Sequence, residues 1–242
     1  MGLLEALFGT RQTQTTVITD VTRMSGRKIC VAALTRGRAI RLAEPHPTED
    51  WLESVGGLIP GNLISVDWQP TRTFKRPHVE DGTWKPASFK KNGVLTYEDF
   101  IFRLSAAVEA GVKEAFGDVS AYSERGNPAF SPGEGPRSLA SIQAENVRVY
   151  PHEEGIRIDF SDGQTNWKMV PVEDLALRRH QVSCPGCAGN MASALLREFG
   201  SDEAILRVGL GRPFQARDDL TACFLQVNHI FPLAARSKHF SS

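Results

Sequence analysis

The 242-residue chain has no excess charge of either sign, because its 28 Lys or Arg residues balance 28 Asp or Glu residues. A neutral chain sets up no whole-molecule field that would pull it toward DNA or an anionic membrane. Its four cysteines are too few for a scaffold built on disulfides at this length. No apolar run approaches the length of a membrane span, and the first ten residues lack the basic segment of a secretory leader. We therefore expect a cytoplasmic protein with no membrane partner.

The neutral total hides a division of charge along the chain. Residues 1–91 contain 13 Lys or Arg against 9 Asp or Glu, whereas residues 92–242 contain 15 against 19. A polyanion is expected to prefer the first part and to bind it in a salt-sensitive way. The acidic C-terminal part is expected to dock a protein partner or to restrain binding.

Short segments of period-two alternation predict that most of the chain is strand. In the first part, the segments 15–34, 37–44 and 59–70 read as a hairpin and two further strands. In the second part, 145–172 predicts three strands joined at two turns, and two closing strands follow at 204–214 and 221–233. Several short strands at close spacing with turn signals between them indicate small barrels.

Two segments predict helices instead. A stripe of apolar residues every four positions predicts one long helix over 96–116, and a shorter helix is predicted over about 188–199. The stripe consists of Phe100, Leu104, Val108, Val112 and Phe116. Residues 117–140 are rich in Gly, Pro and Ser, a composition typical of a linker. The predicted fold class is mainly β, with two OB-like barrels, one long bridging helix and a shorter second helix.

Several motifs in the chain resemble the dual OB-containing domain of bacteria. These are "VTRMSGRKICVAAL", "RAIRL", "PHVED", "IRIDFSDG", "LRVGLGRPF" and "CFLQVNHIFP", which extend from Thr15 to Pro232. The resemblance implies two OB-type barrels and a role related to nucleic acid, as an accessory of a defence or conflict system. The predicted parts are an N-terminal segment, a first barrel, the helix with the linker, a second barrel and a tail, over 1–14, 15–95, 96–140, 141–235 and 236–242.

The first part of the chain contains the candidate nucleic-acid interface. Single-strand binders of the OB type combine cations that neutralise phosphates with aromatic rings that stack on bases, and residues 72–91 contain both. The predicted contact residues are Arg23, Arg41, Arg72, Phe74, Lys75, Arg76, Trp84 and Lys85. The alternative is a solvated loop whose aromatic side chains pack into the barrel. The residues do not distinguish DNA from RNA.

A compact polar cluster, His78, Glu80 and Asp81, lies within the same segment. A histidine and two carboxylates could hold a divalent metal in a nuclease-like enzyme. Adjacent carboxylates on a strand point to opposite faces, however, which favours a role in shaping the loop. We therefore assign no catalytic residue. A metal-dependent enzyme and a protein-interaction scaffold remain the alternatives to a nucleic-acid-binding module.

The segment "HQVSCPGC" lies outside the family resemblance and contains a second candidate site. His180, Cys184 and Cys187 could supply three of the four ligands of a structural zinc ion. The alternatives are a pair of ordinary reduced thiols or a redox-active C-x-x-C pair. Zinc is the one cofactor that the sequence suggests.

Overall fold

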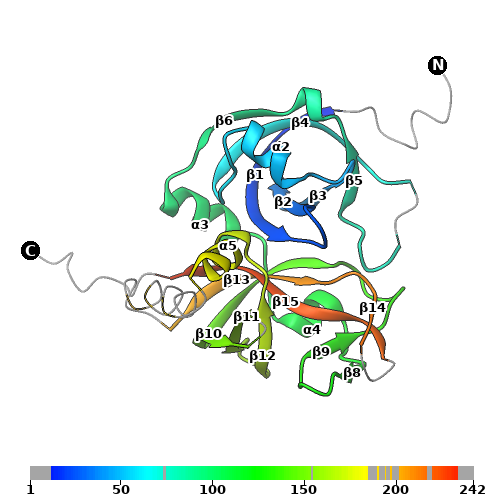
Figure 1. Ribbon diagram of the computed structural model, residues 1–242, viewed down its shortest axis with the longest axis vertical. Helices are drawn as coiled ribbons and strands as arrows, with labels where there is room; N and C mark the ends of the chain where they lie inside the picture. The colour runs from blue at the N-terminus through cyan, green and yellow to red at the C-terminus, as the bar shows by residue number, and fades with distance from the viewer. Residues whose placement is uncertain are drawn as a thin grey trace, which may run out of the picture. The chain divides into compact units, whose positions relative to one another are not determined.

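The structure is a computed structural model, and the prediction of a mainly β chain is confirmed. It describes residues 12–72, 75–153, 155–184, 190, 194, 197, 202–216 and 220–233, without the side chains of 12–15, 181 and 182. The chain divides into two compact units, Met1–Ala107 and Val108–Ser242 (Figure 1). In the described part of the chain, no helix has the length and apolar character needed to cross a bilayer.

Five strands of the first unit pair in a closed ring. They are β1 (Gln12–Arg23), β2 (Ile29–Thr35), β3 (Arg38–Glu44), β4 (Asn62–Pro70) and β5 (Asp81–Trp84). The pairing order is β1-β2-β3-β5-β4 and back to β1, with β3 and β5 parallel and the other neighbours antiparallel. The short helix α2 (Glu49–Ser54) lies between β3 and β4 in the chain. This is the strand order of an OB barrel.

Further short elements complete the first unit. They are the 3-10 turn η1 (Pro86–Ser88), the strand β6 (Lys90–Val94) and the helix α3 (Tyr97–Ser105). β6 pairs antiparallel with the beginning of β4. Thr96 caps α3, since its hydroxyl accepts a hydrogen bond from Asp99 N, as the capping pattern in the sequence predicts.

The second unit repeats the same strand order. Its ring consists of β10 (Leu139–His152), β11 (Gly155–Ser161), β12 (Asn166–Val172), β13 (Ala204–Leu210) and β15 (Thr221–Pro232). The order is β10-β11-β12-β15-β13 and back to β10, with β12 and β15 parallel. The helix α5 (Leu175–Ser183) again lies between the third and fourth strands of the ring. Each unit therefore has the closed ring of strands that the prediction of two OB-like barrels requires.

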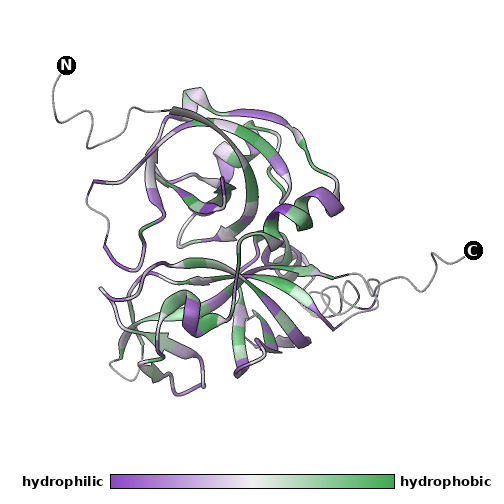
Figure 2. Ribbon diagram, turned by 180° about the vertical axis from the view of Figure 1, so that it is seen from behind, coloured by the Kyte–Doolittle hydropathy of each residue, from purple (hydrophilic) through white to green (hydrophobic). Residues whose placement is uncertain are grey.

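The cores of both rings follow from alternation along the strands. In β11, Ile156, Ile158 and Phe160 are buried, while Arg157 and Asp159 between them lie on the other face and are half-buried. The same change between hydrophobic and hydrophilic residues is visible along other strands (Figure 2). Burial of the apolar members removes their surface from water and stabilises each ring.

The single long helix predicted over 96–116 is wrong. The segment forms α3, a two-residue strand β7 (Val108–Glu109) and the short helix α4 (Val112–Phe116). The apolar stripe is divided accordingly, because Phe100 and Leu104 are buried in the first unit and Val112 and Phe116 in the second. A regular period of four therefore did not imply one continuous helix.

The segment predicted as a linker, 117–140, is not all loop. It contains β8 (Ala121–Tyr122) and β9 (Pro128–Phe130), and β9 pairs with β15. Ala129 and Phe130 are buried, and the Phe130 ring packs edge-on against Phe116 at 5.9 Å. Opposite β9, the short strand β14 (Phe214–Gln215) also pairs with β15. The helix predicted over 188–199 falls largely outside the described residues.

Asp162, in the turn between β11 and β12, holds α4 to the second ring. Its Oδ2 accepts hydrogen bonds from Val112 N at 3.0 Å and Trp167 Nε1 at 2.8 Å. Its Oδ1 accepts from the backbone N–H groups of Gln164 and Thr165. A side chain at Gly111 would crowd this carboxylate, since a Cβ there would lie 3.0 Å from Oδ2. The absence of a side chain at Gly111 therefore lets Asp162 bind the first turn of α4.

Protonation of the Asp162 carboxylate should lower the stability of the fold at acid pH. Burial by itself raises the pKa of Asp162, but the four hydrogen bonds, led by that from Val112 N, lower the pKa below its ordinary value. A carboxyl with a depressed pKa stabilises the fold above its unfolded pKa, near 4, and that stability is lost as the pH falls through the folded pKa. We expect Asp162→Asn to lower the free energy of unfolding by about 1.5–3 kcal/mol at pH 7. The variant should also lose less stability than the wild type as the pH falls. Urea unfolding from pH 7 to pH 3 measures both effects. An equal slope in both proteins would contradict this role.

Candidate nucleic-acid interface

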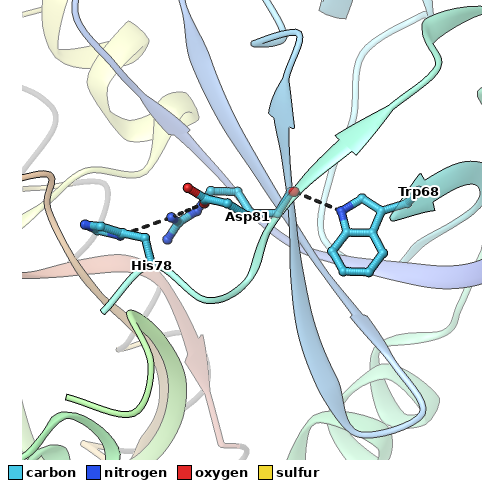
Figure 3. Close-up of polar contacts among 4 residues, drawn as sticks. Trp68, His78 and Asp81 are labelled. Atoms are coloured by element: carbon cyan, nitrogen blue, oxygen red, sulfur yellow. Dashed lines mark hydrogen bonds and ion pairs between the residues drawn. The ribbon is translucent and has the colours of Figure 1, made fainter. Parts of the chain in front are cut away.

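Arg41 is the centre of a buried polar cluster on β3. Its neighbours Ile40 and Leu42 point into the barrel core, so Arg41 lies on the outer face, yet only 6% of it is exposed. Its Nη1 donates to Asp81 Oδ1 at 2.8 Å and lies 3.3 Å from His78 Nδ1 (Figure 3). The pair Arg41 and Asp81 lies directly opposite in the parallel register of β3 and β5. The cluster is therefore a cross-strand ion pair with a histidine beside it.

The loop between β4 and β5 is fastened to β3 at this cluster. Arg41 N donates to Glu80 O at 2.8 Å, and Trp68 Nε1 donates to Arg41 O at 3.1 Å (Figure 3). At Gly82, a Cβ would lie 1.9 Å from Trp68 Nε1, so the glycine lets the indole reach the β3 backbone. These contacts hold the end of the loop, at Glu80 and Asp81, against β3.

The charges of this cluster favour an ionised arginine. Burial alone lowers the pKa of Arg41, but the Cys30 thiol when deprotonated and the carboxylates of Asp81 and Glu80 raise it above its usual range. The prediction that Arg41 contacts phosphate is therefore corrected, because its guanidinium is buried and paired with a carboxylate. His78, Glu80 and Asp81 are buried as well, and these described side chains do not gather into a group that could hold a metal ion. The polar cluster shapes the loop.

Trp84 does not present a ring to solvent, which corrects its predicted stacking role. It is 3% exposed, and its Nε1 donates to Pro45 O at 2.7 Å. Its ring packs edge-on against Trp51 at 5.1 Å, and Trp51 packs in the same way against Phe89 at 5.0 Å. Trp51, from α2, completes this three-ring cluster, and it is the partner that sequence reasoning missed. Phe74 lies outside the described residues.

The remaining predicted cations are exposed on the first unit. Arg23 lies where β1 ends, and Arg72, Lys75 and Arg76 lie on the loop between β4 and β5. Lys85 is exposed just after β5. Two further exposed cations, Arg27 and Lys28, lie in the turn between β1 and β2, and Arg27 pairs with Asp50 at 2.5 Å.

Both cation-bearing loops border the same pair of strands. The β1–β2 turn leads directly into β2, and the β4–β5 loop is held to β3 through Glu80 O and Arg41 N. The β2 and β3 strands are antiparallel neighbours in the ring. Exposed positive charge therefore flanks the β2–β3 pair from two separate loops. We define the cationic loops as residues 23–28 and, in the β4–β5 loop, residues 71, 72 and 75–80.

The proposed zinc site is not assembled by the described residues. His180 lies in α5 and Cys184 follows its last turn, whereas Cys187 lies outside the described residues. Cys184 is disulfide-bonded in this structure. Among the residues described, no three His, Cys, Asp or Glu side chains form a metal-binding group.

One polar pair of the second unit was missed from the sequence. Asp174 caps α5, since its Oδ1 accepts from Leu177 N at 2.9 Å and its Oδ2 pairs with His229 Nδ1. The pair links the helix to β15. The signal for the helix was present, because an Asp directly before "LALRRH" is a typical N-terminal cap. Its histidine partner, 55 residues away, had no such signal.

Comparisons with known proteins add little to this geometry. No family model matches the chain, and no curated protein matches it. A solved structure described as the p204 HINb domain is similar over 90% of this chain and 97% of that chain, at 13% identity and a TM-score of 0.36. This likeness is too weak to carry an argument. The OB-type assignment therefore rests on strand pairing, and the resemblance to the dual OB-containing family stays a prediction.

Proposed function

We propose that the chain is a nucleic-acid-binding module whose first unit contacts the phosphates of a single or structured strand through the cationic loops. The observation that carries the proposal is the exposure of cations on both loops that flank β2 and β3. In OB barrels, the face of the second and third strands and the loops after the first and fourth strands bind oligonucleotides. The net positive charge of residues 1–91 favours the same unit.

The contact set differs from the sequence prediction. Arg41 and Trp84 belong to the folded interior, so phosphate contact is assigned to the exposed residues Arg23, Arg72, Lys75 and Arg76. Lys85, exposed after β5, extends this set. Exposed cations of this kind neutralise phosphates and do not read bases, so binding should be strong at low salt and weakly dependent on base sequence.

Charge reversal on the β4–β5 loop tests the proposal. We expect Arg72→Glu/Lys75→Glu/Arg76→Glu to weaken binding on the order of 10- to 100-fold for DNA and RNA alike, since three phosphate contacts become repulsive. Fluorescence anisotropy with labelled 20-nucleotide single strands and hairpins measures the change. All three residues are exposed, so the variant should keep the wild-type thermal stability.

The matched control reverses the same amount of charge elsewhere. Lys90, Arg103 and Lys113 are exposed and lie outside the cationic loops. Lys90→Glu/Arg103→Glu/Lys113→Glu should weaken binding much less than the loop variant. Equal losses in the two variants would show that net charge alone governs binding and would remove the assignment to the loops.

A further inference from the structure

The outer face of β10, β11 and β12 in the second unit holds a tyrosine in one position. Tyr150 on β10 is half-buried, and its hydroxyl donates to Asp159 Oδ1 on β11 at 2.8 Å. Asp159 Oδ1 also accepts a hydrogen bond from Met169 N on β12 at 2.8 Å. The Met169 Sδ lies 3.0 Å from the Tyr150 hydroxyl. Burial and the bond to Asp159 raise the pKa of Tyr150 to about 12, so the hydroxyl stays protonated and keeps donating.

The backbone is distorted to make this contact. Met169 has a φ of 59°, in the left-handed region that residues other than glycine rarely adopt. The β11–β12 register shifts between Ile158 and Phe160, at the position of Asp159. Strain of this kind persists only where surrounding contacts hold it, and it is enriched at binding sites. Here Asp159 accepts the hydrogen bond that holds the Met169 backbone, and the same carboxylate orients the Tyr150 hydroxyl.

Each of the three strands carries a cation near the position of Tyr150. Arg157 lies directly opposite Tyr150 in the β10–β11 register and is half-buried. Arg148, two residues before Tyr150, and Lys168, next to Met169, are exposed. Two carboxylates also lie on this face. Asp159, directly opposite Arg148 in the register, is engaged by the tyrosine and the Met169 backbone, and Glu145 is exposed opposite Ser161. An oriented ring among exposed cations complements an aromatic base flanked by phosphates.

We propose that this face is a second site for single-stranded nucleic acid, in which Tyr150 stacks on a base and Arg148 and Lys168 neutralise the adjacent phosphates. The site lies in the acidic half of the chain. Binding there therefore depends on the local position of the cations and not on the net charge of that half. The site is independent of the cationic loops and stands if their assignment fails.

Substitution of Tyr150 in two backgrounds tests the second site. The backgrounds are the wild type and Arg72→Glu/Lys75→Glu/Arg76→Glu, and the probe is a labelled 10-nucleotide oligothymidine at low salt. The length suits one OB-type barrel. We expect Tyr150→Ala to weaken binding in the charge-reversed background roughly 5- to 150-fold, the range of one lost stacking contact, while Tyr150→Phe keeps the ring and most of the affinity.

A second variant keeps the test valid if Tyr150→Ala unfolds the unit. Arg148→Glu/Lys168→Glu changes two exposed side chains only, and we expect it to weaken the same probe by about tenfold or more. Arg103→Glu/Lys113→Glu is its charge-matched control and should have a smaller effect. Binding equal to that of the parent in both Tyr150→Ala and Arg148→Glu/Lys168→Glu would overturn the second site.

The two proposals fail in different ways. If the charge-reversed loop variant retains no affinity and the Tyr150 variants match wild type, the second site is wrong and the loops remain the interface. If the loop variant binds like wild type and the Tyr150→Ala variant does not bind, the second site holds and the loop assignment is wrong.

Discussion

Asp81→Ala lowers the free energy of unfolding of the first unit by about 3–5 kcal/mol, because it leaves a buried guanidinium without its carboxylate. The side chains of Arg41 and Asp81 are 7% and 11% exposed, and they meet at 2.8 Å. A guanidinium keeps its proton at any pH at which the protein is folded, so the arginine cannot relieve the loss by becoming neutral. Urea unfolding followed by tryptophan fluorescence measures the change, since three of the four tryptophans, at 51, 68 and 84, lie in this unit.

An exposed ion pair of the same unit provides the control. Arg27 and Asp50 also form an ion pair, but their side chains are 67% and 68% exposed. Solvent screens such a pair, so Asp50→Ala should cost less than about 1 kcal/mol. A similar small cost for Asp81→Ala would contradict the view that the cluster at β3 holds the β4–β5 loop in place.

Trp84→Ala should destabilise the first unit by about 3–5 kcal/mol, the usual cost of removing a large buried aromatic side chain. The substitution removes an edge-on contact to Trp51, a contact to Phe89 and the hydrogen bond to Pro45 O. Trp84→Phe keeps a ring in the cluster and loses the hydrogen bond, so a smaller cost is expected. Both are measured by urea unfolding.

The same variants decide between packing and base stacking for Trp84. A packing role predicts that Trp84→Phe, where folded, binds labelled oligonucleotides as wild type does. A stacking role predicts reduced affinity with unchanged stability. That second result would restore the sequence-based assignment and contradict the buried position.

The strands were predictable, whereas their outer faces were not. Alternation in segments such as 15–34 depends on neighbours one or two residues apart, so the sequence carries it directly. The burial of Arg41 depends on a loop some 40 residues later that folds over the outer face of β3, and an arginine on that face would ordinarily be in water. For the same reason, Trp84 was assigned to the surface, because its partner Trp51 lies in a different element.

Local signals could also mislead where two elements meet. The stripe over 96–116 continued through Gly111 without a break in period, but α3 ends at Ser105 and a new helix begins at Val112, whose N–H donates to Asp162 Oδ2. No pattern near Gly111 indicated a carboxylate 50 residues away. Tyr150 and Arg148 did carry a readable signal, since they alternate with the core residues Val147 and Val149.

The salt dependence of binding by the wild-type chain tests the central claim most directly. Anisotropy of a labelled 20-nucleotide single strand, titrated at several salt concentrations from about 50 to 300 mM, gives the slope of log Kd against log salt. Contact between the cationic loops and phosphates predicts a steep slope, with about 0.7 contributed by each phosphate neutralised. A measurable affinity that does not change with salt, or no binding at the lowest salt, would contradict the account.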